Sequence, residues 1–216
     1  MTATSAAADL QNDHLSISPS VLYFGTPVVL LVTSNEDGTP NVTPMSSAWA
    51  LGSRVVLGLS SASQGAANLR RERECTLNFA SADLWSKVEK IARGTGRDPV
   101  PAFKQAMGFM HIADKFEAGG FTPIPSQRLR APRIMECPLQ FEARLLAIHG
   151  DEIDPVPAPQ SALIIECEVV HVHAHRQIVV PGTNHIDTRR WNPLYYVFRH
   201  YFGDARDLGR NFRAEA

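Results

Sequence analysis

The sequence predicts a single domain that is mainly β, with flanking helices. Six runs of apolar and β-branched residues are separated by turn residues, and they cover 27–34, 41–51, 54–60, 75–80, 136–148 and 162–175. Between them, two stretches carry apolar residues at helical spacing. A chain of 216 residues, 44% of them hydrophobic, can bury one substantial core, and β-rich domains of this size often remain single.

The first two runs are expected to form a hairpin. Residues 27–34 are a near-continuous apolar strand pattern, and 35–38 supply turn residues that end in a glycine able to adopt positive φ. The second strand, 41–51, contains Pro44, which has no N–H to donate to a ladder. We therefore expect a sheet edge or bulge there, where backbone groups can face a ligand.

Hydroxyl and amide side chains gather where strand 54–60 gives way to a helical pattern ending near Arg73. A helix N-terminus offers unpaired N–H groups and a partial positive charge to an anion, so a phosphate site is one interpretation. The other is a well-capped helix without a ligand, because Ser61 and Gln64 fit the capping box S-x-x-Q. Both interpretations stay open at this point.

The middle of the chain is less regular. Residues 82–93 predict a helix with Ser81 or Asp83 as its cap, ending near Gly94. Residues 94–131 are rich in glycine and proline, with a second short helix expected at 102–110. Long excursions of this kind are usually functional lids or disordered segments.

Two long strands, 136–148 and 162–175, are expected to be linked by the acidic, proline-rich hairpin Gly150–Gln160. A short strand follows at 178–180, and 193–202 is interpreted as a helix or turn. The aromatic residues of that last stretch are more typical of an interface or core than of a cofactor site. Residues 1–18 predict a flexible N-terminal arm, and 19–216 the single domain.

Composition narrows the class of protein. A net charge of −1 gives no overall field for nucleic acid, although 17 arginines among the 21 basic residues leave room for a local basic pocket. Cys75, Cys137 and Cys167 are far apart in apolar runs, which indicates buried, inert thiols and a reducing cytosol. Neither a signal peptide nor an apolar segment of ~20 residues is recognised, so we expect a soluble cytoplasmic protein without membrane partners.

A metal site is considered at His171, His173 and His175, which share one face of a strand. Same-face neighbours are roughly 6.6 Å apart, so the outer two are about 13 Å apart and one ion cannot hold all three. The sequence therefore predicts no metal site, and a half-solvated strand face instead. Motifs of hydrolases and nucleotide-binding enzymes such as G-x-S-x-G, H-E-x-x-H, Walker A and G-x-G-x-x-G are also missing from the sequence.

Several motifs follow one another along the chain, each occurring once: Asn41-x-Thr43-Pro44-Met45-Ser46-Ser47-Ala48, Ser60-Ser61-x-Ser63-Gln64-x-x-x-Asn68-Leu69, Glu74-Cys75-x-Leu77-Asn78, and three more at 115–122, 132–142 and 193–196. This order resembles the flavin reductase family with the FMN-binding split β-barrel fold of Greek-key type, which includes flavoredoxin-like and flavoprotein oxygenase-associated proteins. The resemblance spans roughly residues 20–203.

The resemblance assigns a cofactor and its contacts. It implies that Ser46, Ser47 and the backbone at Thr43 and Met45 contact the isoalloxazine ring of FMN, where N–H groups can steady charge on N5 and O4. The phosphate and ribityl contacts that it implies are Ser61, Ser63, Gln64 and Asn68, and Asn78 is expected to face the same pocket. No side chain is assigned as catalytic, because the hydride passes between nicotinamide and flavin while the protein binds and orients them.

The expected function is that of an FMN-binding, NAD(P)H-dependent oxidoreductase that transfers hydride from NADH or NADPH to flavin N5. Reduced flavin would pass to a monooxygenase partner or reduce a bound substrate. One alternative is an FMN-binding protein for electron transfer or storage without direct NAD(P)H oxidation, and another is a member of this architecture without flavin. An edge-like strand, clustered aromatics and a free arm also predict a homodimer, and the resemblance implies that both subunits contribute to each cofactor pocket.

Overall fold

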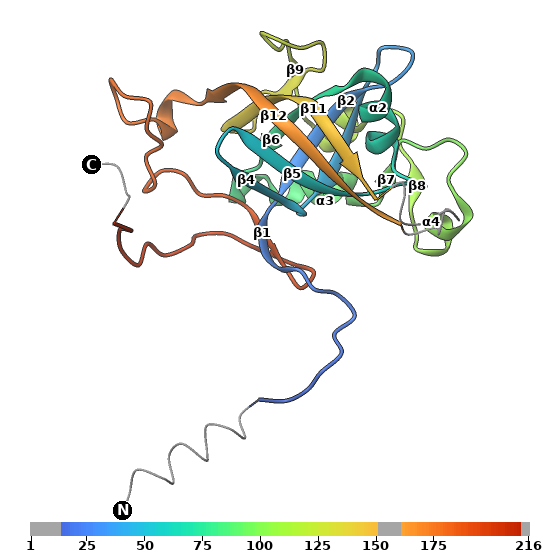
Figure 1. The fold of residues 1–216 in the computed structure, drawn as a ribbon, viewed down its shortest axis with the longest axis horizontal. Coiled ribbons are helices and arrows are strands. Elements are labelled where there is room, and N and C mark those ends of the chain that lie inside the picture. Colours follow the sequence, from blue (N-terminus) through green and yellow to red (C-terminus); the bar gives the residue numbers. More distant parts are fainter. Residues whose placement is uncertain (1–13, 151–160, 213–216) are drawn as a thin grey trace, which may run out of the picture.

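The computed structural model describes residues 14–150 and 161–212, and its main feature is a curled antiparallel sheet (Figure 1). The sheet has seven strands in the order β3-β2-β6-β11-β12-β5-β4. The strands are β2 (Val29–Ser34), β3 (Pro40–Met45), β4 (Ala48–Leu51), β5 (Arg54–Ser60), β6 (Glu74–Phe79), β11 (Leu139–His149) and β12 (Ala162–Ala174). The predicted class, a mainly β split barrel with flanking helices, is confirmed.

Strands β3 and β4 follow each other in the chain but occupy opposite edges of the sheet. Only Ser46 and Ser47 lie between them, so the sheet must curl until its two edges almost meet. The Gly58 N–H donates to the Ser47 carbonyl at 2.7 Å. Gly58 permits this approach, since a Cβ there would lie 2.9 Å from Ser47 Cβ.

The prediction of one continuous strand over 41–51 is therefore wrong in one respect: the run is broken at Ser46-Ser47. Its first half pairs with β2, as the predicted hairpin requires, but its second half pairs with β5. The break occurs because the chain changes edge at this point. Pro44 lies on an edge strand, as predicted.

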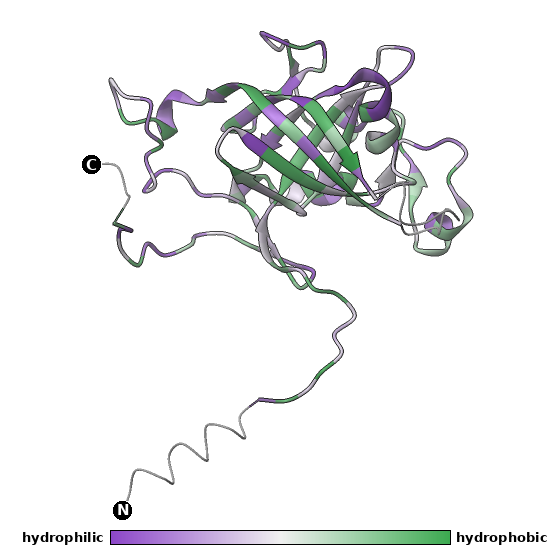
Figure 2. Cartoon of the chain, in the orientation of Figure 1, coloured by the Kyte–Doolittle hydropathy of each residue, from purple (hydrophilic) through white to green (hydrophobic). Residues whose placement is uncertain are grey.

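Two apolar cores lie on the two faces of the sheet, and Figure 2 shows the apolar residues concentrated along the central strands. The first core fills the curl and is closed by Ala66 and Leu69 of α2 (Gln64–Glu72). The second core includes residues of α3 (Trp85–Ala92) and α5 (Lys115–Gly119). All three cysteines are buried with free thiols, as predicted: Cys75 and Cys167 in the first core, Cys137 in the second.

Helix α2 begins two residues later than the capping-box interpretation requires. Ser63, not Ser61, is its N-cap, and the Ser63 hydroxyl accepts a hydrogen bond from the Ala66 N–H at 3.0 Å. The helix ends near Arg73, as predicted, and Arg73 is its C-cap residue in a left-handed conformation. The next predicted helix is also present, as the 3₁₀ turn η1 (Ala82–Leu84) followed by α3. Its N-cap residue, Ser81, makes no side-chain capping bond.

The excursion at 94–131 is more structured than predicted. It contains the expected short helix as α4 (Ala102–Ala106), and it also contains α5, which the sequence analysis missed. Asp114 caps α5 by accepting from the Glu117 N–H at 2.9 Å. Short strand pairs complete this part of the chain: β7 (Gly94–Thr95) with β8 (Met110–His111), and β9 (Pro123–Ile124) with β10 (Arg133–Ile134).

The C-terminal stretch differs most from the prediction. A hairpin of β13 (Tyr195–Val197) and β14 (His200–Phe202) replaces the helix or turn expected at 193–202, and it pairs with β1 (Phe24–Pro27). The pairing partner is about 170 residues earlier in the chain, which no local pattern reveals. The strand predicted at 178–180 is also wrong, because η2 (Arg176–Ile178) is a 3₁₀ turn and Val179 makes only an isolated bridge to Ile186. The predicted arm 1–18 and link Gly150–Gln160 fall largely outside the described residues.

Candidate functional site

Two hollows have residues of the 43–47 segment, the end of β3 and its link to β4, in their walls. The larger, which we call the outer hollow, has a volume of about 550 Å³ and is lined by Ser47, Thr26 and residues 19–24. The smaller, which we call the inner cavity, has a volume of about 90 Å³ and includes Thr43 and Pro44 in its wall. Residues 43–47 thus contribute to both hollows, and they include all four predicted ring-contact residues.

Thr26 is a polar residue of the outer hollow that the sequence analysis did not single out. Its hydroxyl is buried and has no hydrogen-bond partner among the described residues. A buried hydroxyl without a partner carries a desolvation cost, so such atoms are uncommon unless a ligand or water satisfies them. Ser47 itself is exposed on the wall of the same hollow, whereas Ser46 is buried and Met45 packs against the first core.

The inner cavity lies at the start of α2. Ser63 and Gln64 form one wall, and Gly94, Thr95 and Gly96 form another. A side chain at position 96 would not fit, because its Cβ would lie 2.4 Å from Asn41 Oδ1 and 3.0 Å from Gln64 Cγ. The glycine therefore lets the 94–96 segment approach the helix closely.

Lys115, from α5, is the buried cation of the inner cavity. Its side chain is almost fully enclosed, with only 3% of the residue exposed. The ammonium donates to Asn41 Oδ1 at 3.1 Å and to the Val42 carbonyl at 2.8 Å. Both acceptors are neutral, and no described carboxylate lies within ion-pair distance. Asn41 in turn donates to Thr43 Oγ1 at 3.2 Å, which connects the cation to the predicted ring-contact strand.

Two further cations converge on the loop before α2. Lys104 of α4 donates to the Ala62 carbonyl at 3.3 Å, and Arg97 donates to the carbonyls of Ala62 and Ser63 at 3.4 Å. Burial, and then the positive charge of Lys104, lowers the pKa of Lys115 to about 8. Burial, and then the charge of Arg97, lowers the pKa of Lys104 as well. The cavity therefore concentrates positive charge that no described side chain neutralises.

Two of the predicted contacts, Ser61 and Asn68, have their polar groups occupied by the protein itself. The Ser61 hydroxyl lies 2.5 Å from the hydroxyl of Ser161. Asn68 is fully buried: its amide donates to Thr33 and Asn35, and its carbonyl oxygen accepts from Gln64 and Arg71. These residues shape the loop and helix that carry Ser63.

Asn78 is not brought to the inner cavity. It pairs with Leu30, whereas Thr43 pairs with Leu31, so alternation places the Asn78 and Thr43 side chains on opposite faces of the sheet. The Asn78 amide donates to the Leu30 carbonyl and to Thr76, and its carbonyl accepts from the Ile134 N–H. The sequence analysis missed this because the register of the pairing decides the face.

The structure instead adds four residues to the site: Thr26, Arg97, Lys104 and Lys115. Lys115 belongs to one of the motifs that resemble the family, but nothing in its local sequence predicts burial. Lysine is seldom fully buried, so the usual expectation for it is exposure. Its place beside β3 and α2 depends on contacts far apart in the chain.

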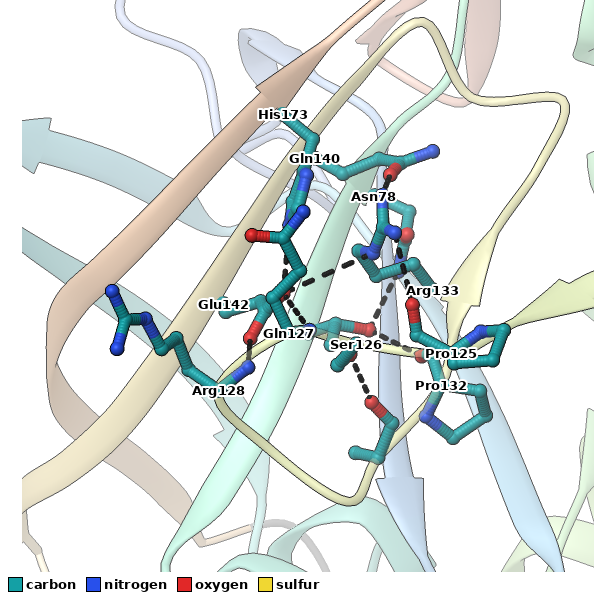
Figure 3. Close-up of polar contacts among 12 residues, drawn as sticks. Asn78, Pro125, Ser126, Gln127, Arg128, Pro132, Arg133, Gln140, Glu142 and His173 are labelled. Atoms are coloured by element: carbon teal, nitrogen blue, oxygen red, sulfur yellow. Dashed lines mark hydrogen bonds and ion pairs between the residues drawn. The ribbon is translucent and has the colours of Figure 1, made fainter.

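A second buried charge, Glu142 of β11, lies on the outer face of the sheet and is fully partnered. Figure 3 shows it beneath the loop that carries Gln127 and Arg128, whose N–H groups donate to the carboxylate at 2.8 and 2.7 Å. His173 approaches the same carboxylate at 2.7 Å. Burial alone would raise the pKa of Glu142, but these three partners hold it below its ordinary value.

Two of the three histidines in the row on β12 are engaged by other residues of the protein. His173 contacts Glu142, and His175 lies 2.9 Å from the Met135 carbonyl oxygen. Burial lowers the pKa of His173, an effect that its bond to Glu142 only partly offsets. Across 14–150 and 161–212, no group of three or more His, Cys, Asp or Glu side chains is arranged to hold a metal ion. In those same ranges no helix is long and apolar enough to cross a membrane.

Comparison with known proteins gives consistent findings. The family model described as "Flavin reductase like domain" matches residues 21–203. The uncharacterized protein YdfE of Bacillus subtilis (strain 168) is 42% identical over 199 residues, which cover 92% of this chain and 93% of that protein.

Two solved structures share the fold at low sequence identity. Flavoredoxin of Desulfovibrio vulgaris (Miyazaki F) is 20% identical with a TM-score of 0.74, covering 93% of this chain and 98% of that one. Nitrilotriacetate monooxygenase component B from Bacillus cereus is 16% identical with a TM-score of 0.69, covering 94% of this chain and 100% of that one.

Proposed function

The chain belongs to the flavin reductase-like family, and we propose that it is an oxidoreductase that binds FMN and uses NADH or NADPH as hydride donor. The observation that carries the proposal is the presence of two hollows whose walls both include residues of the 43–47 segment. One hollow has an unpartnered hydroxyl, and the other has uncompensated positive charge. A flavin mononucleotide has a planar polar ring at one end and a phosphate at the other, which suits this pair.

The ring end is proposed to lie at the outer hollow. Its volume of about 550 Å³ is within the range of small-molecule sites. Ser47 would contact the ring there, with backbone groups of the 43–47 segment, and Thr26 supplies a hydroxyl that still needs a partner. When bound, FMN supplies the isoalloxazine that accepts hydride from the nicotinamide. The protein's part is to orient the ring and to place N–H donors at its edge.

The phosphate end is proposed to lie at the inner cavity. Ser63 and Gln64 form the start of α2, where N–H groups and the helix dipole favour an anion. Lys104 and Lys115 are the charged residues of the lining. Ser61 and Asn68 support this end by holding the loop and the helix in position through their own hydrogen bonds. We do not extend the proposed site to Asn78.

We further propose that the working unit is a homodimer with FMN near the subunit boundary. Trp49 and Leu51 on edge strand β4 are 59% and 75% exposed, and Leu22 and Phe24 beside the outer hollow are 73% and 78% exposed. Large apolar side chains gathered around an open site are typical of an interaction surface. Two-fold pairing is the commonest way to cover such a surface, and it would also close the outer hollow. A partner monooxygenase that receives reduced flavin fits the same function.

The test is spectroscopic. Purified protein reconstituted with FMN should show a protein-bound flavin spectrum, and anaerobic NADH or NADPH should bleach it. Bound flavin that neither nucleotide bleaches would instead favour an electron-transfer or storage protein, and failure to bind flavin would overturn the proposal. Sedimentation across a dilution series tests the dimer: FMN should strengthen association by linkage, whereas a monomer that retains full FMN affinity would contradict a shared site.

A further inference from the structure

We propose that Lys115 makes the inner cavity selective for a phosphate dianion, and that the protein takes up a proton when this anion binds. The inference rests on the proposed function for the identity of the natural ligand, the phosphate monoester of FMN. It adds the residue that discriminates FMN from riboflavin and a dependence of affinity on pH.

The first step is the enclosure of the ammonium group. Lys115 is 3% exposed, and its two hydrogen bonds go to Asn41 Oδ1 and the Val42 carbonyl, which are neutral. An ammonium can donate three hydrogen bonds, so one donor remains available. Burying a charge without an opposite charge is costly, and the group shifts its pKa toward the neutral form. A negatively charged ligand would remove that cost.

The second step is the composition of the cavity wall. Its charged residues are Lys104 and Lys115, and its other residues are neutral: Thr43, Pro44, Ser63, Gln64, Ala92, Gly94, Thr95, Gly96 and Phe109. Beyond the lining, Arg97 adds a third positive charge near the Ala62 and Ser63 carbonyls. On α5 itself, Asp114 is engaged as the helix cap. Among the described residues that line the cavity, every charged side chain is therefore basic.

The third step is room for an anion. The cavity volume of about 90 Å³ exceeds the ~30 Å³ share of one water in the liquid. It opens between the start of α2 and the 94–96 segment, so an anion there would meet Lys115, Lys104 and the helix N–H groups together. A phosphate dianion satisfies several donors at once, whereas the uncharged end of riboflavin leaves the two lysines uncompensated.

The sign of the proton coupling follows from these charges. Without anion, burial and the neighbouring Lys104 lower the pKa of Lys115 to about 8, so near pH 8 the group is half neutral. An adjacent dianion favours the ammonium and raises this pKa again. Binding at pH 8 therefore draws about half a proton per site from the buffer. Affinity for FMN should be nearly constant between about pH 7 and 8, and it should fall by up to about tenfold for each unit above pH 8. It should also fall below about pH 6, where the phosphate monoester itself becomes protonated.

The experiment is titration calorimetry of the full-length protein at pH 8 with FMN, riboflavin and inorganic phosphate. Each titration is run in two buffers of different ionisation enthalpy, which gives the number of protons taken up. The variants are Lys115→Met, which keeps the length of the side chain without charge, and Lys115→Arg, which stays charged at every accessible pH. Lys90→Met, on the exposed side of α3, is the control for loss of one lysine elsewhere.

Wild type and Lys90→Met should take up about half a proton per site with FMN and none with riboflavin. Lys115→Met should take up none, and its preference for FMN over riboflavin should fall by about tenfold or more. Lys115→Arg should keep much of the preference without proton uptake. An unchanged preference in Lys115→Met, or equal uptake with riboflavin, would overturn the inference while leaving the proposed function intact. If neither flavin binds, the proposed function fails, and inorganic phosphate then decides whether Lys115 forms an anion site.

Discussion

Glu142 and Lys115 are both buried charges on this small domain, but their surroundings are opposite. Glu142 accepts two backbone hydrogen bonds and is paired with His173, and the guanidinium of Arg133 lies 3.9 Å away. Lys115 has two neutral acceptors, and the neighbouring charge that acts on its pKa is the positive charge of Lys104. The Glu142 carboxylate therefore has its hydrogen-bond and charge partners without a ligand. The Lys115 ammonium would gain an opposite charge only from a bound anion. This difference distinguishes a charge with a structural role from a charge with a role in ligand binding.

The largest expected effect is at Glu142. Glu142→Ala should lower the free energy of unfolding by about 3–5 kcal/mol, because two N–H groups and His173 lose their charged partner. Chemical denaturation measures the loss. Glu168→Gln, on an exposed position of the neighbouring strand, is the matched control and should change stability by no more than about 0.5 kcal/mol. A loss below about 1 kcal/mol for Glu142→Ala would show that the loop at 127–128 does not depend on this carboxylate.

Substitution of Lys115 should change the free energy of unfolding in the opposite direction. Lys115→Met should raise the stability of the ligand-free protein by roughly 1–3 kcal/mol at pH 7. Each unit by which the pKa is lowered costs about 1.36 kcal/mol, and the two lost hydrogen bonds offset part of the gain. Destabilisation of the size expected for Glu142→Ala would mean that Lys115 is a structural residue, and the contrast between the two regions would fail.

The two regions should also respond to pH on opposite sides of neutrality. The folded-state pKa of His173 lies below its ordinary 6.5 and that of Glu142 below 4.5, so the unfolded chain binds more protons and stability falls as the pH drops through these values. Lys115 is lowered from 10.5 to about 8, so stability rises between pH 8 and 10.5. Between pH 8 and 10.5 the rise in the free energy of unfolding should be smaller in Lys115→Met than in wild type, and Lys104, whose pKa is also lowered, should account for the remaining rise.

A smaller effect on stability is expected at Ser63, which is both the N-cap of α2 and a proposed contact of the phosphate. Ser63→Ala should lower stability by about 1 kcal/mol, because the Ala66 N–H loses its acceptor. It should also weaken FMN more than riboflavin if the phosphate lies at this helix end. Ser63→Thr keeps the hydroxyl and serves as the control. Equal weakening of both flavins would place the phosphate elsewhere.

The smallest effect on stability is expected at Ser47, which is exposed and makes its bond to Gly58 through the backbone. Ser47→Val should change the unfolding free energy of the ligand-free protein by no more than about 0.5 kcal/mol. The flavin reduction potential or the rate of reduction by NAD(P)H should change, because a group at the proposed ring contact is lost. A large loss of stability with an unchanged potential would make Ser47 a structural residue.

The sequence predicted those parts of the fold that local patterns determine. Helix α2 and the strands β2, β6, β11 and β12 follow from spacing and turn residues, and the buried cysteines follow from their apolar runs. The break at Ser46-Ser47 was not predicted, because the alternation of residues does not show that the chain changes from the β2 edge to the β5 edge there. The pairing of β13 with β1 was not predicted, because its partner strand is remote in the sequence.

The candidate site divides in the same way. The 43–47 segment and the start of α2 were found through motifs, and the structure places both at the hollows. Lys115, Lys104 and Arg97 were missed because their convergence requires the 94–115 excursion to fold back over α2. Asn78 was assigned to the site because a motif places it near the other residues in sequence, while the register of β6 with β2 turns it to the other face.

The Ser46–Ser47 link also bears on the order in which this protein folds. It joins the two edges of a seven-stranded sheet, so its native geometry requires the intervening strands β2, β6, β11, β12 and β5 to be in place. Contacts between residues distant in sequence form late, since loop-closure entropy must be overcome first. The backbone donors of the 43–47 segment are therefore assembled by the final closure of the barrel. A partly folded chain would lack the proposed ring contacts. Flavin binding during refolding would therefore report the closure of the barrel, and it would not help the first strands to form.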